Sequence, residues 1–307
     1  MRLCGKIKVK MQSGLILLNK KTGITSFDAL RDIKRALGTG KVGHTGTLDK
    51  FAQGLMLILT GKALKLSRWF SHCDKKYQGR VHFGIETDTL DPEGVQIAQA
   101  ALPSREEVEK VLNQFKGNIM QEPPVYSAIH VDGKRASRLA RSGNAPEMKK
   151  RPVTIYNLEL ITWQPPFADF FIHCSSGTYI RSLARDIALA AGSRAHLSAL
   201  VRTQIANFFL NDCKINQEGS DIPLVNSITK NITASLGLPR FEVTVQDAQK
   251  IFQGKQLESI LENKTLITNP LPSSLHFKDE AAVFEGDNLI AMIEQKNNIW
   301  KYNCTLL

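Results

Sequence analysis

The order of strand-like and helix-like segments limits the folds that this chain can adopt. Apolar runs and alternations typical of strands occur at residues 14–20, 75–87, 153–163 and 168–175. Apolar residues recur with helical spacing at residues 25–38, 104–117 and 177–192. These segments do not follow the regular strand–helix–strand alternation of a doubly wound parallel sheet. The sequence therefore predicts an α+β fold.

The predicted helices have recognisable ends and apolar faces. Thr25 with Asp28, and Ser104 with Glu107, have the spacing of capping boxes, and a glycine ends each of these helices. The apolar face of the first helix consists of Phe27, Leu30, Ile33 and Leu37. The buried stripe of the third helix consists of Ile180, Leu183, Ala184, Ile187, Ala188 and Ala191. That stripe leaves Arg181 and Arg185 together on a neighbouring face.

The charge of the chain is compatible with a polyanionic partner. The 307 residues include 40 Lys and Arg against 29 Asp and Glu, which gives a net charge of +11. The surplus lies near the start, because residues 1–50 hold 11 basic and 3 acidic side chains whereas residues 240–307 hold 7 and 9. A nucleic acid fits this balance better than a basic small molecule does, although a solvated basic surface fits the charge alone equally well.

The cysteines and the apolar runs bear on the location of the protein. The five cysteines are scattered without any C-x-x-C pair, and such an odd number suits reduced thiols in the cytoplasm. The apolar run near the start is too short for a signal peptide, and no later run approaches about 20 residues. We expect a cytoplasmic protein that has neither a membrane span nor a metal site.

A glycine-rich segment joins the first predicted helix to the apolar run LMLIL. This segment, GKVGHTGTLDKFAQG, is too irregular for a helix and too broken for a strand, and it presents Asp49 as a candidate catalytic carboxylate. Taken alone, an aspartate in such a turn, or a histidine such as His44, more often serves only as a hydrogen-bonding residue. Gly38, Gly40 and Gly43 have the G-x-G-x-x-G spacing, but they follow a helix where a dinucleotide site requires a strand. A nucleotide-binding protein therefore stays as a minor alternative.

Five segments of the chain form a series that points to a family. They are LNKKTGITSFDAL, GHTGTLDKFAQGLM, KKYQGRVHFGIETDTLDPEG, QEPPVYSAIHVDGKRASRLAR and CSSGTYIRSLARDIALAAG. In this order they resemble the tRNA pseudouridine-55 synthases of the TruB family, and the resemblance covers nearly all of residues 14–210. It implies the pseudouridine synthase fold, in which helices flank a mixed, largely antiparallel sheet.

The resemblance also implies a division of the chain into domains. Residues 1–238 would form the catalytic domain, with a basic RNA-binding insertion at about 121–152. Residues 239–307 resemble, more weakly, the small β-rich PUA-type RNA-binding domain. The polar stretch 216–239 has the composition of a linker, which places the boundary near Pro239.

The activity implied by the resemblance is the isomerisation of one uridine, at position 55 in the T-arm loop of tRNA, to pseudouridine. The N1–C1′ bond breaks, the freed base turns within the pocket, and C5 bonds to C1′. Asp49 matches the essential aspartate of the family, which either attacks C1′ or removes a proton from C2′. The resemblance implies a monomer whose partner is the T-arm of tRNA and which needs no metal or cofactor.

The same resemblance assigns roles to other residues. Arg181 would pair with Asp49 and keep it ionised by lowering its pKa, and Tyr77 would stack on the target base. His44 would fill the space that flipped bases leave, and Tyr179 and Leu200 would border the pocket. The residues expected to contact RNA are Lys20, Lys134, Arg135, Arg141, Lys149 and Arg151. Arg138 and Lys150 belong to the same basic stretch.

Several positions depart from the family pattern. Lys21 and Lys50 stand where the family usually has proline, and Gln53 replaces a small hydroxyl residue. Without the fixed φ of a proline after Asp49, the carboxylate is expected to be held less rigidly. These departures motivate an alternative of a different class, a non-enzymatic tRNA-binding or tRNA-folding protein on the same fold.

Overall fold

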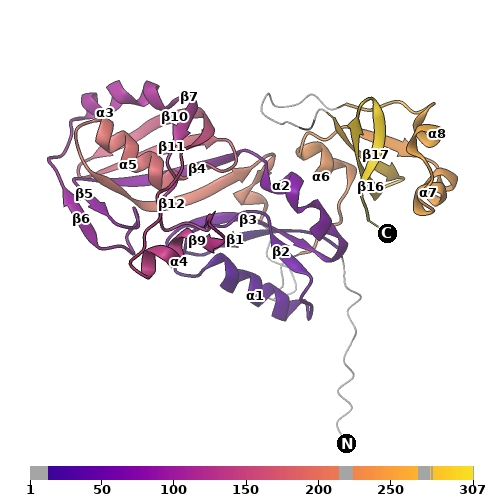
Figure 1. The fold of residues 1–307 in the computed structure, drawn as a ribbon, viewed down its shortest axis with the longest axis horizontal. Coiled ribbons are helices and arrows are strands. Elements are labelled where there is room, and N and C mark those ends of the chain that lie inside the picture. Colours follow the sequence, from indigo (N-terminus) through magenta and orange to yellow (C-terminus); the bar gives the residue numbers. More distant parts are fainter. Residues whose placement is uncertain (1–12, 214–223, 269–276, 278, 307) are drawn as a thin grey trace, which may run out of the picture.

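The computed structural model describes residues 13–213, 224–268, 277 and 279–306, which form two separate main sheets (Figure 1). The strands of the larger sheet are β1 (Gly14–Lys20), β2 (Val42–His44), β3 (Gln53–Thr60), β4 (Lys75–Phe83), β7 (Gly117–Gln121), β10 (Arg151–Gln164), β11 (Phe167–Cys174), β12 (Ala195–Ile205) and β13 (Phe208–Phe209). Their order across the sheet is β1-β3-β12-β4-β11-β10-β7, with β2 beside β3 and β13 beside β12. Among the described strands of this sheet, β3 and β12 pair in parallel and the other pairs are antiparallel. The predicted mixed, largely antiparallel sheet is therefore confirmed.

Short elements connect these strands. Two small hairpins are formed by β5 (Ile85–Thr87) with β6 (Gln96–Gln99), and by β8 (His130–Val131) with β9 (Lys134–Arg135). The helices of this part are α1 (Ser26–Ala36), α2 (Ser67–Ser71), α3 (Arg105–Leu112), α4 (Ala136–Arg141) and α5 (Ile180–Ala190). The 3-10 turns are η1 (Gly61–Leu66), η2 (Asn113–Phe115) and η3 (Leu210–Asp212).

The local signals for helices were mostly correct. Both predicted capping boxes are present at the starts of α1 and α3. Phe27 is an exception, because it is 67% exposed although it was placed on the apolar face of α1. The glycine-rich segment is less irregular than expected, since its residues Val42–His44 form β2.

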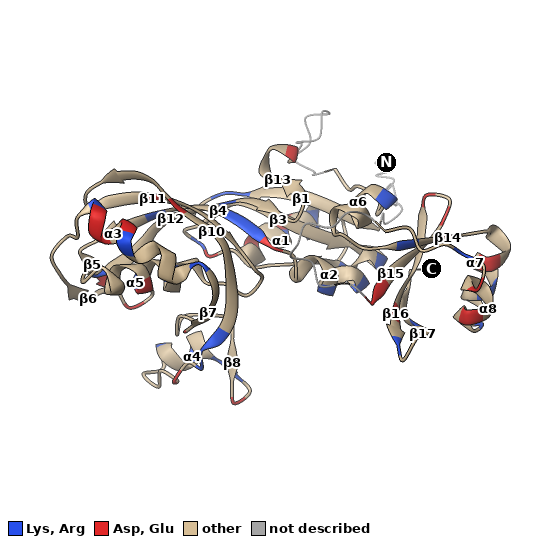
Figure 2. Cartoon of the chain, turned by 90° about the horizontal axis from the view of Figure 1, so that it is seen from above, with Lys and Arg blue, Asp and Glu red and all other residues tan. Residues whose placement is uncertain are grey.

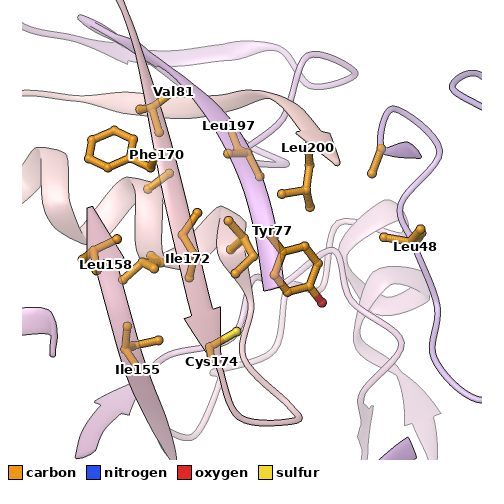
Figure 3. Packing of buried hydrophobic residues seen from close by; sticks show 14 of the residues in the cluster. Leu48, Tyr77, Val81, Ile155, Leu158, Phe170, Ile172, Cys174, Leu197 and Leu200 are labelled. Carbon is orange, nitrogen blue, oxygen red and sulfur yellow. The ribbon is translucent and has the colours of Figure 1, made fainter. Parts of the chain in front are cut away.

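The main core lies between the sheet and the helices α3 and α5 (Figure 1). The predicted stripe of α5, which includes Leu183, Ala184 and Ile187, is buried against β4, β11 and β12. Figure 3 shows the sheet side of this cluster, where Val81, Ile172 and Leu197 are among the labelled side chains. Packing of this stripe fixes α5, and with it the position of Arg181, relative to the strands.

The second sheet follows the expected boundary. Its strands are β14 (Arg240–Val243), β15 (Glu280–Glu285), β16 (Asn288–Lys296) and β17 (Ile299–Thr305), and it is accompanied by α7 (Val245–Phe252) and α8 (Leu257–Leu261). The stretch expected to be a linker contains a helix, α6 (Lys230–Ser235), and the two leucines after it, Leu236 and Leu238, are buried, so a plain linker is wrong for these residues. Residues 214–223 of that stretch lie outside the described residues.

The two sheets share a hydrophobic cluster. Trp69 and Phe70 of α2 pack in the same cluster as Phe284 and Met292 of the smaller sheet, and α2 lies between the sheets in Figure 1. The indole of Trp69 also donates a hydrogen bond to Glu280 at the start of β15. The smaller sheet is thus packed directly against the larger unit, while the division into a catalytic and a PUA-like domain stays a prediction.

The described residues lack two features. No helix among them is long and apolar enough to cross a membrane. No group of three or more His, Cys, Asp and Glu side chains in this part of the chain could hold a metal ion.

Candidate active site

The loop that carries Asp49 runs from β2 to β3 and is held at several points. Ser26, the first residue of α1, donates from its hydroxyl to the carbonyl of Leu48 at 2.9 Å and accepts from the amide of Leu48 at 2.9 Å. After the aspartate, the amide of Ala52 donates to the carbonyl of Asp49 at 3.2 Å. The amide of Gly23 donates to the carbonyl of Lys50 at 2.9 Å. The loop therefore has a defined conformation although it is rich in glycine.

Arg202 of β12 anchors the same loop from the sheet. Its buried guanidinium donates to the carbonyls of Gly46 at 3.1 Å and Leu55 at 2.7 Å. The backbone of Arg202 comes so close to β3 that a Cβ on Gly54, which has φ of +112°, would lie 2.4 Å from the Arg202 carbonyl oxygen. Only glycine fits at this contact. Arg202 was not among the predicted site residues, because nothing local distinguishes it from a solvated arginine.

Asp49 forms an ion pair with Arg181 in the first turn of α5. Arg181 Nη2 donates to Asp49 Oδ1 at 3.1 Å, and Arg181 Nε lies 2.9 Å from Asp49 Oδ2 without the geometry of a hydrogen bond. The Arg181 side chain is 6% exposed, whereas that of Asp49 is 37% exposed. The two residues thus lie together as the sequence predicted, and a buried guanidinium presents a carboxylate that solvent and ligands can reach.

A second aspartate, Asp91, holds Arg181 from the opposite side. Asp91 Oδ2 lies 3.2 Å from Arg181 Nη1, and Arg181 also donates to the carbonyls of Thr89 at 2.8 Å and Tyr126 at 3.0 Å. Asp91 is buried in a tight turn in which Leu90 has φ of +59°, a conformation uncommon for leucine. Strain of this kind tends to gather at functional sites. Asp91 was not among the predicted site residues.

The pKa of Asp49 reflects the balance between burial and these charges. Burial raises the pKa of Asp49 above its ordinary value, and the positive charge of Arg181 only partly opposes this effect. Arg181 thus lowers the pKa of Asp49, as the resemblance implies, but burial has the larger effect and the net shift is upward. Because the pKa of Asp49 is higher in the folded chain than in the unfolded one, the protonated carboxyl favours folding. Its contribution to the free energy of unfolding is therefore lost as the pH rises through the folded-state pKa.

This shift predicts the acid side of the pH profile. If the ionised carboxylate of Asp49 carries the reaction, the single-turnover rate should fall at acid pH with a midpoint above about 3.9, the ordinary aspartate pKa. The rate should be measured with saturating substrate from about pH 4 to pH 8, and circular dichroism at each pH should verify that the chain stays folded. A midpoint at or below the ordinary value would contradict the burial of Asp49.

Tyr77 of β4 and Leu200 of β12 lie at the edge of the main core near the Asp49 loop. Figure 3 shows both at the end of the cluster that is nearest Leu48, the residue before Asp49. Both are buried, and burial raises the pKa of Tyr77 to about 12. The charge of Asp49 contributes to that shift, so the predicted stacking residue and the predicted catalyst are neighbours.

His44 and Tyr179 begin two of the segments that meet at the site. His44 ends β2 and leads into the Asp49 loop, and its buried Nδ1 has no hydrogen-bond partner among the described residues. Burial lowers the pKa of His44, so the ring is neutral at pH 7. Tyr179 precedes α5 and is fixed by Gln121, whose side chain accepts from the Tyr179 amide at 2.8 Å and donates to its carbonyl at 3.1 Å.

Lys20 does not fit the RNA contact that was predicted for it. Its side chain is 1% exposed, and its ammonium group donates to the carbonyls of Lys21 at 3.0 Å and Ile24 at 2.8 Å. Burial lowers the pKa of Lys20, while the negative charge of Asp49 opposes this. Lys20 therefore supports the backbone behind the Asp49 loop instead of meeting a phosphate.

The predicted RNA-binding insertion projects from the larger sheet, at the ends of β7 and β10 (Figure 2). Its basic residues are exposed, and among the described residues none of them forms a salt bridge with an acidic side chain. They are Lys134, Arg135, Arg138, Arg141, Lys149, Lys150 and Arg151. Their charges are therefore available to a partner, as the prediction required.

Comparison of the sequence with known families and proteins gives consistent results. Residues 34–180 match the model of the TruB family pseudouridylate synthase (N terminal domain). The chain is 43% identical over 219 residues to "tRNA pseudouridine synthase B" of Borreliella burgdorferi (strain ZS7), a match that covers 70% of this chain and 78% of the relative. It is 39% identical over 256 residues to the protein of the same name from Azoarcus sp. (strain BH72), which covers 82% of this chain and 85% of the relative.

The fold has solved counterparts as well. A chain of a Cbf5–Nop10–Gar1 complex superimposes with a TM-score of 0.68 at 21% identity, over 96% of this chain and 85% of that one. A chain of the archaeal box H/ACA sRNP Nop10–Cbf5 complex gives a TM-score of 0.68 at 18% identity, over 98% and 88%. At these low sequence identities, the superpositions show a likeness of fold alone. The sequence matches go further, and they establish that the chain belongs to the TruB family of pseudouridylate synthases, as its five motif segments predict.

Proposed function

We propose that this protein converts the uridine at position 55 in the T-arm loop of tRNA to pseudouridine, with Asp49 as the catalytic carboxylate. The observation that carries the proposal is the ion pair of a partly exposed Asp49 with a buried Arg181, at the edge of an apolar core. The names of the relatives, tRNA pseudouridine synthase B, support tRNA as the substrate.

The chemistry requires a charged carboxylate beside the ribose of the target nucleotide. The N1–C1′ bond breaks, C5 of the same base bonds to C1′, and the proton on C5 is replaced by one on N1, so the product is an isomer of the substrate. Asp49 acts either as a nucleophile at C1′ or as a base at C2′, and both roles need it ionised. The hydrogen bond and the ion pair with Arg181 orient the carboxylate for either role.

The residues around Asp49 suit a base that has left its stack. The ring of Tyr77, which is buried at the edge of the apolar core, would stack on a base that enters beside the loop, and Leu200 lies in the same apolar cluster. The unpartnered Nδ1 of the neutral His44 can accept a hydrogen bond from an RNA group that enters beside the loop.

The basic insertion supplies affinity through phosphate contacts. The logarithm of tRNA affinity should therefore fall with the logarithm of salt concentration, with a slope of about 0.7–0.9 per phosphate contacted. Replacing Lys134 and Arg135 by alanine should lower that slope by roughly 1.4–1.8. The charge-matched control, alanine at the exposed Lys110 and Lys116 beside α3, should leave it unchanged. Equal slopes for both pairs would show that the insertion does not bind phosphates.

The proposed function is tested by incubating the protein with an unmodified tRNA transcript and mapping pseudouridine at each uridine. We expect modification at position 55 and none in a transcript with cytidine there. Product at another uridine would leave the enzyme class intact and refute the T-arm assignment. Tight tRNA binding without any product would favour the alternative of a tRNA-folding protein. The monomeric state and the cytoplasmic location stay predictions.

A further inference from the structure

Two loops of the active site are joined by an ion pair on the molecular surface. Lys50, which follows Asp49, lies with its Nζ 3.0 Å from Glu93 Oε1. Both side chains are about half exposed, at 51% and 44%. Glu93 belongs to the turn of Asp91, and its amide donates to Asp91 Oδ1 at 3.0 Å.

These contacts close a ring around the catalytic centre. In the buried layer, Arg181 bridges the side chains of Asp49 and Asp91. In the exposed layer, Lys50 and Glu93 bridge the backbone segments next to the same two aspartates. The two loops are thus linked at two depths, and only the inner link uses groups assigned to the reaction.

We propose that the Lys50–Glu93 ion pair is an outer clasp, which holds the Asp49 loop against the Asp91 loop and so positions the catalytic carboxylate. This inference rests on the catalytic role proposed for Asp49. Lys50 does not fix φ after Asp49 as a proline at this position would. An exposed ion pair and a restraint on one φ angle each contribute modestly to stability, so the ion pair can replace the restraint.

The clasp also changes the charge that Asp49 experiences. The charged or titratable groups that face Asp49 from the elements packed around it are Lys20, Tyr77, Asp91, Glu93, Tyr179 and Arg181. Among them Glu93 carries a negative charge that raises the pKa of Asp49. Lys50 partly neutralises this charge. A merely structural contact would lack this electrostatic consequence.

The test is a double-mutant cycle with Lys50→Ala, Glu93→Gln and the double variant. Single-turnover rates are measured with saturating tRNA at a pH well above the acid limb. Each single variant should be slower by a factor of about two to five, and the double variant no slower than the slower single one. Lys21→Ala is the matched control, because Lys21 is an exposed neighbour whose side chain has no salt bridge among the described residues; it should react at the wild-type rate.

The acid limb of the pH–rate profile, measured for the same variants, gives the second test. Lys50→Ala should move it to higher pH and Glu93→Gln to lower pH, while the double variant should resemble Glu93→Gln. Rate effects that multiply in the double variant would overturn the clasp. So would a Lys50→Ala variant with the wild-type rate and a salt slope smaller by about 0.7–0.9, since Lys50 would then contact a phosphate. A wild-type protein that forms no pseudouridine would refute the proposed function instead, so the two failures are distinguishable.

Discussion

Replacing Asp49 by asparagine is expected to lower the single-turnover rate of pseudouridine formation by about 10³- to 10⁶-fold, the range seen when an acid–base or nucleophilic group is removed. Asparagine has the same size and can still accept a hydrogen bond from Arg181, but it can neither attack C1′ nor take a proton from C2′. Binding of tRNA should change little, because the exposed basic residues of the insertion remain.

The same variant should not be less stable than the wild type. Burial raises the pKa of Asp49, so ionising this carboxyl costs more free energy in the folded chain than in the unfolded one, and a neutral residue removes that cost. Thermal unfolding should therefore occur at an equal or higher temperature. Asp32→Asn, at an exposed aspartate of α1, serves as the control and should keep full activity. Full activity of Asp49→Asn would refute the assignment, and lost activity together with lost folding would leave Asp49 a structural residue.

Local sequence signals predicted the elements that position the site. The capping boxes at Thr25 and Ser104 set the starts of α1 and α3, because a side chain and an amide three residues later suffice to define them. The apolar stripe of α5 predicted which face is buried. Phe27 shows the limit of such patterns: it has the correct spacing, yet it is 67% exposed.

The partners of the catalytic pair could not be read from local sequence. Asp91 lies 90 positions before Arg181, in a stretch whose Asp-Pro-Glu-Gly composition is typical of any turn. Arg202 is an arginine on a strand, and only the folded structure reveals that its guanidinium is buried against the Asp49 loop. Contacts between side chains so far apart in the sequence depend on the order of the strands in the sheet. The family resemblance supplied Arg181 but not its second aspartate.

The prediction that Lys20 contacts RNA failed for a related reason. A lysine in a basic segment is usually solvated, and the sequence carries no signal that this one lies under the loop. In the structure it satisfies two backbone carbonyls beside Asp49. The basic character of a segment therefore did not show that this basic side chain has a structural role.

Replacing Arg181 by methionine should have the second large effect, and it should act on stability as well as on activity. Arg181 and Asp91 are both buried, with side chains 6% and 7% exposed. Removal of one member of a buried pair leaves the other charge without compensation, which costs about 3–5 kcal/mol. The carbonyls of Thr89 and Tyr126 also lose a donor. The free energy of unfolding in urea should fall by that amount.

The double variant Arg181→Met with Asp91→Asn separates the two consequences. Because no uncompensated charge remains in the interior, it should recover part of the lost stability relative to Arg181→Met. It should not recover activity, since Asp49 would still lack the guanidinium that orients it and opposes the rise of its pKa. If the double variant is no more stable than the single one, the stability of this centre comes from the hydrogen bonds to the carbonyls and not from the charge of Asp91. If it regains activity, Arg181 serves the fold alone, and the ionised state of Asp49 must be maintained by another group.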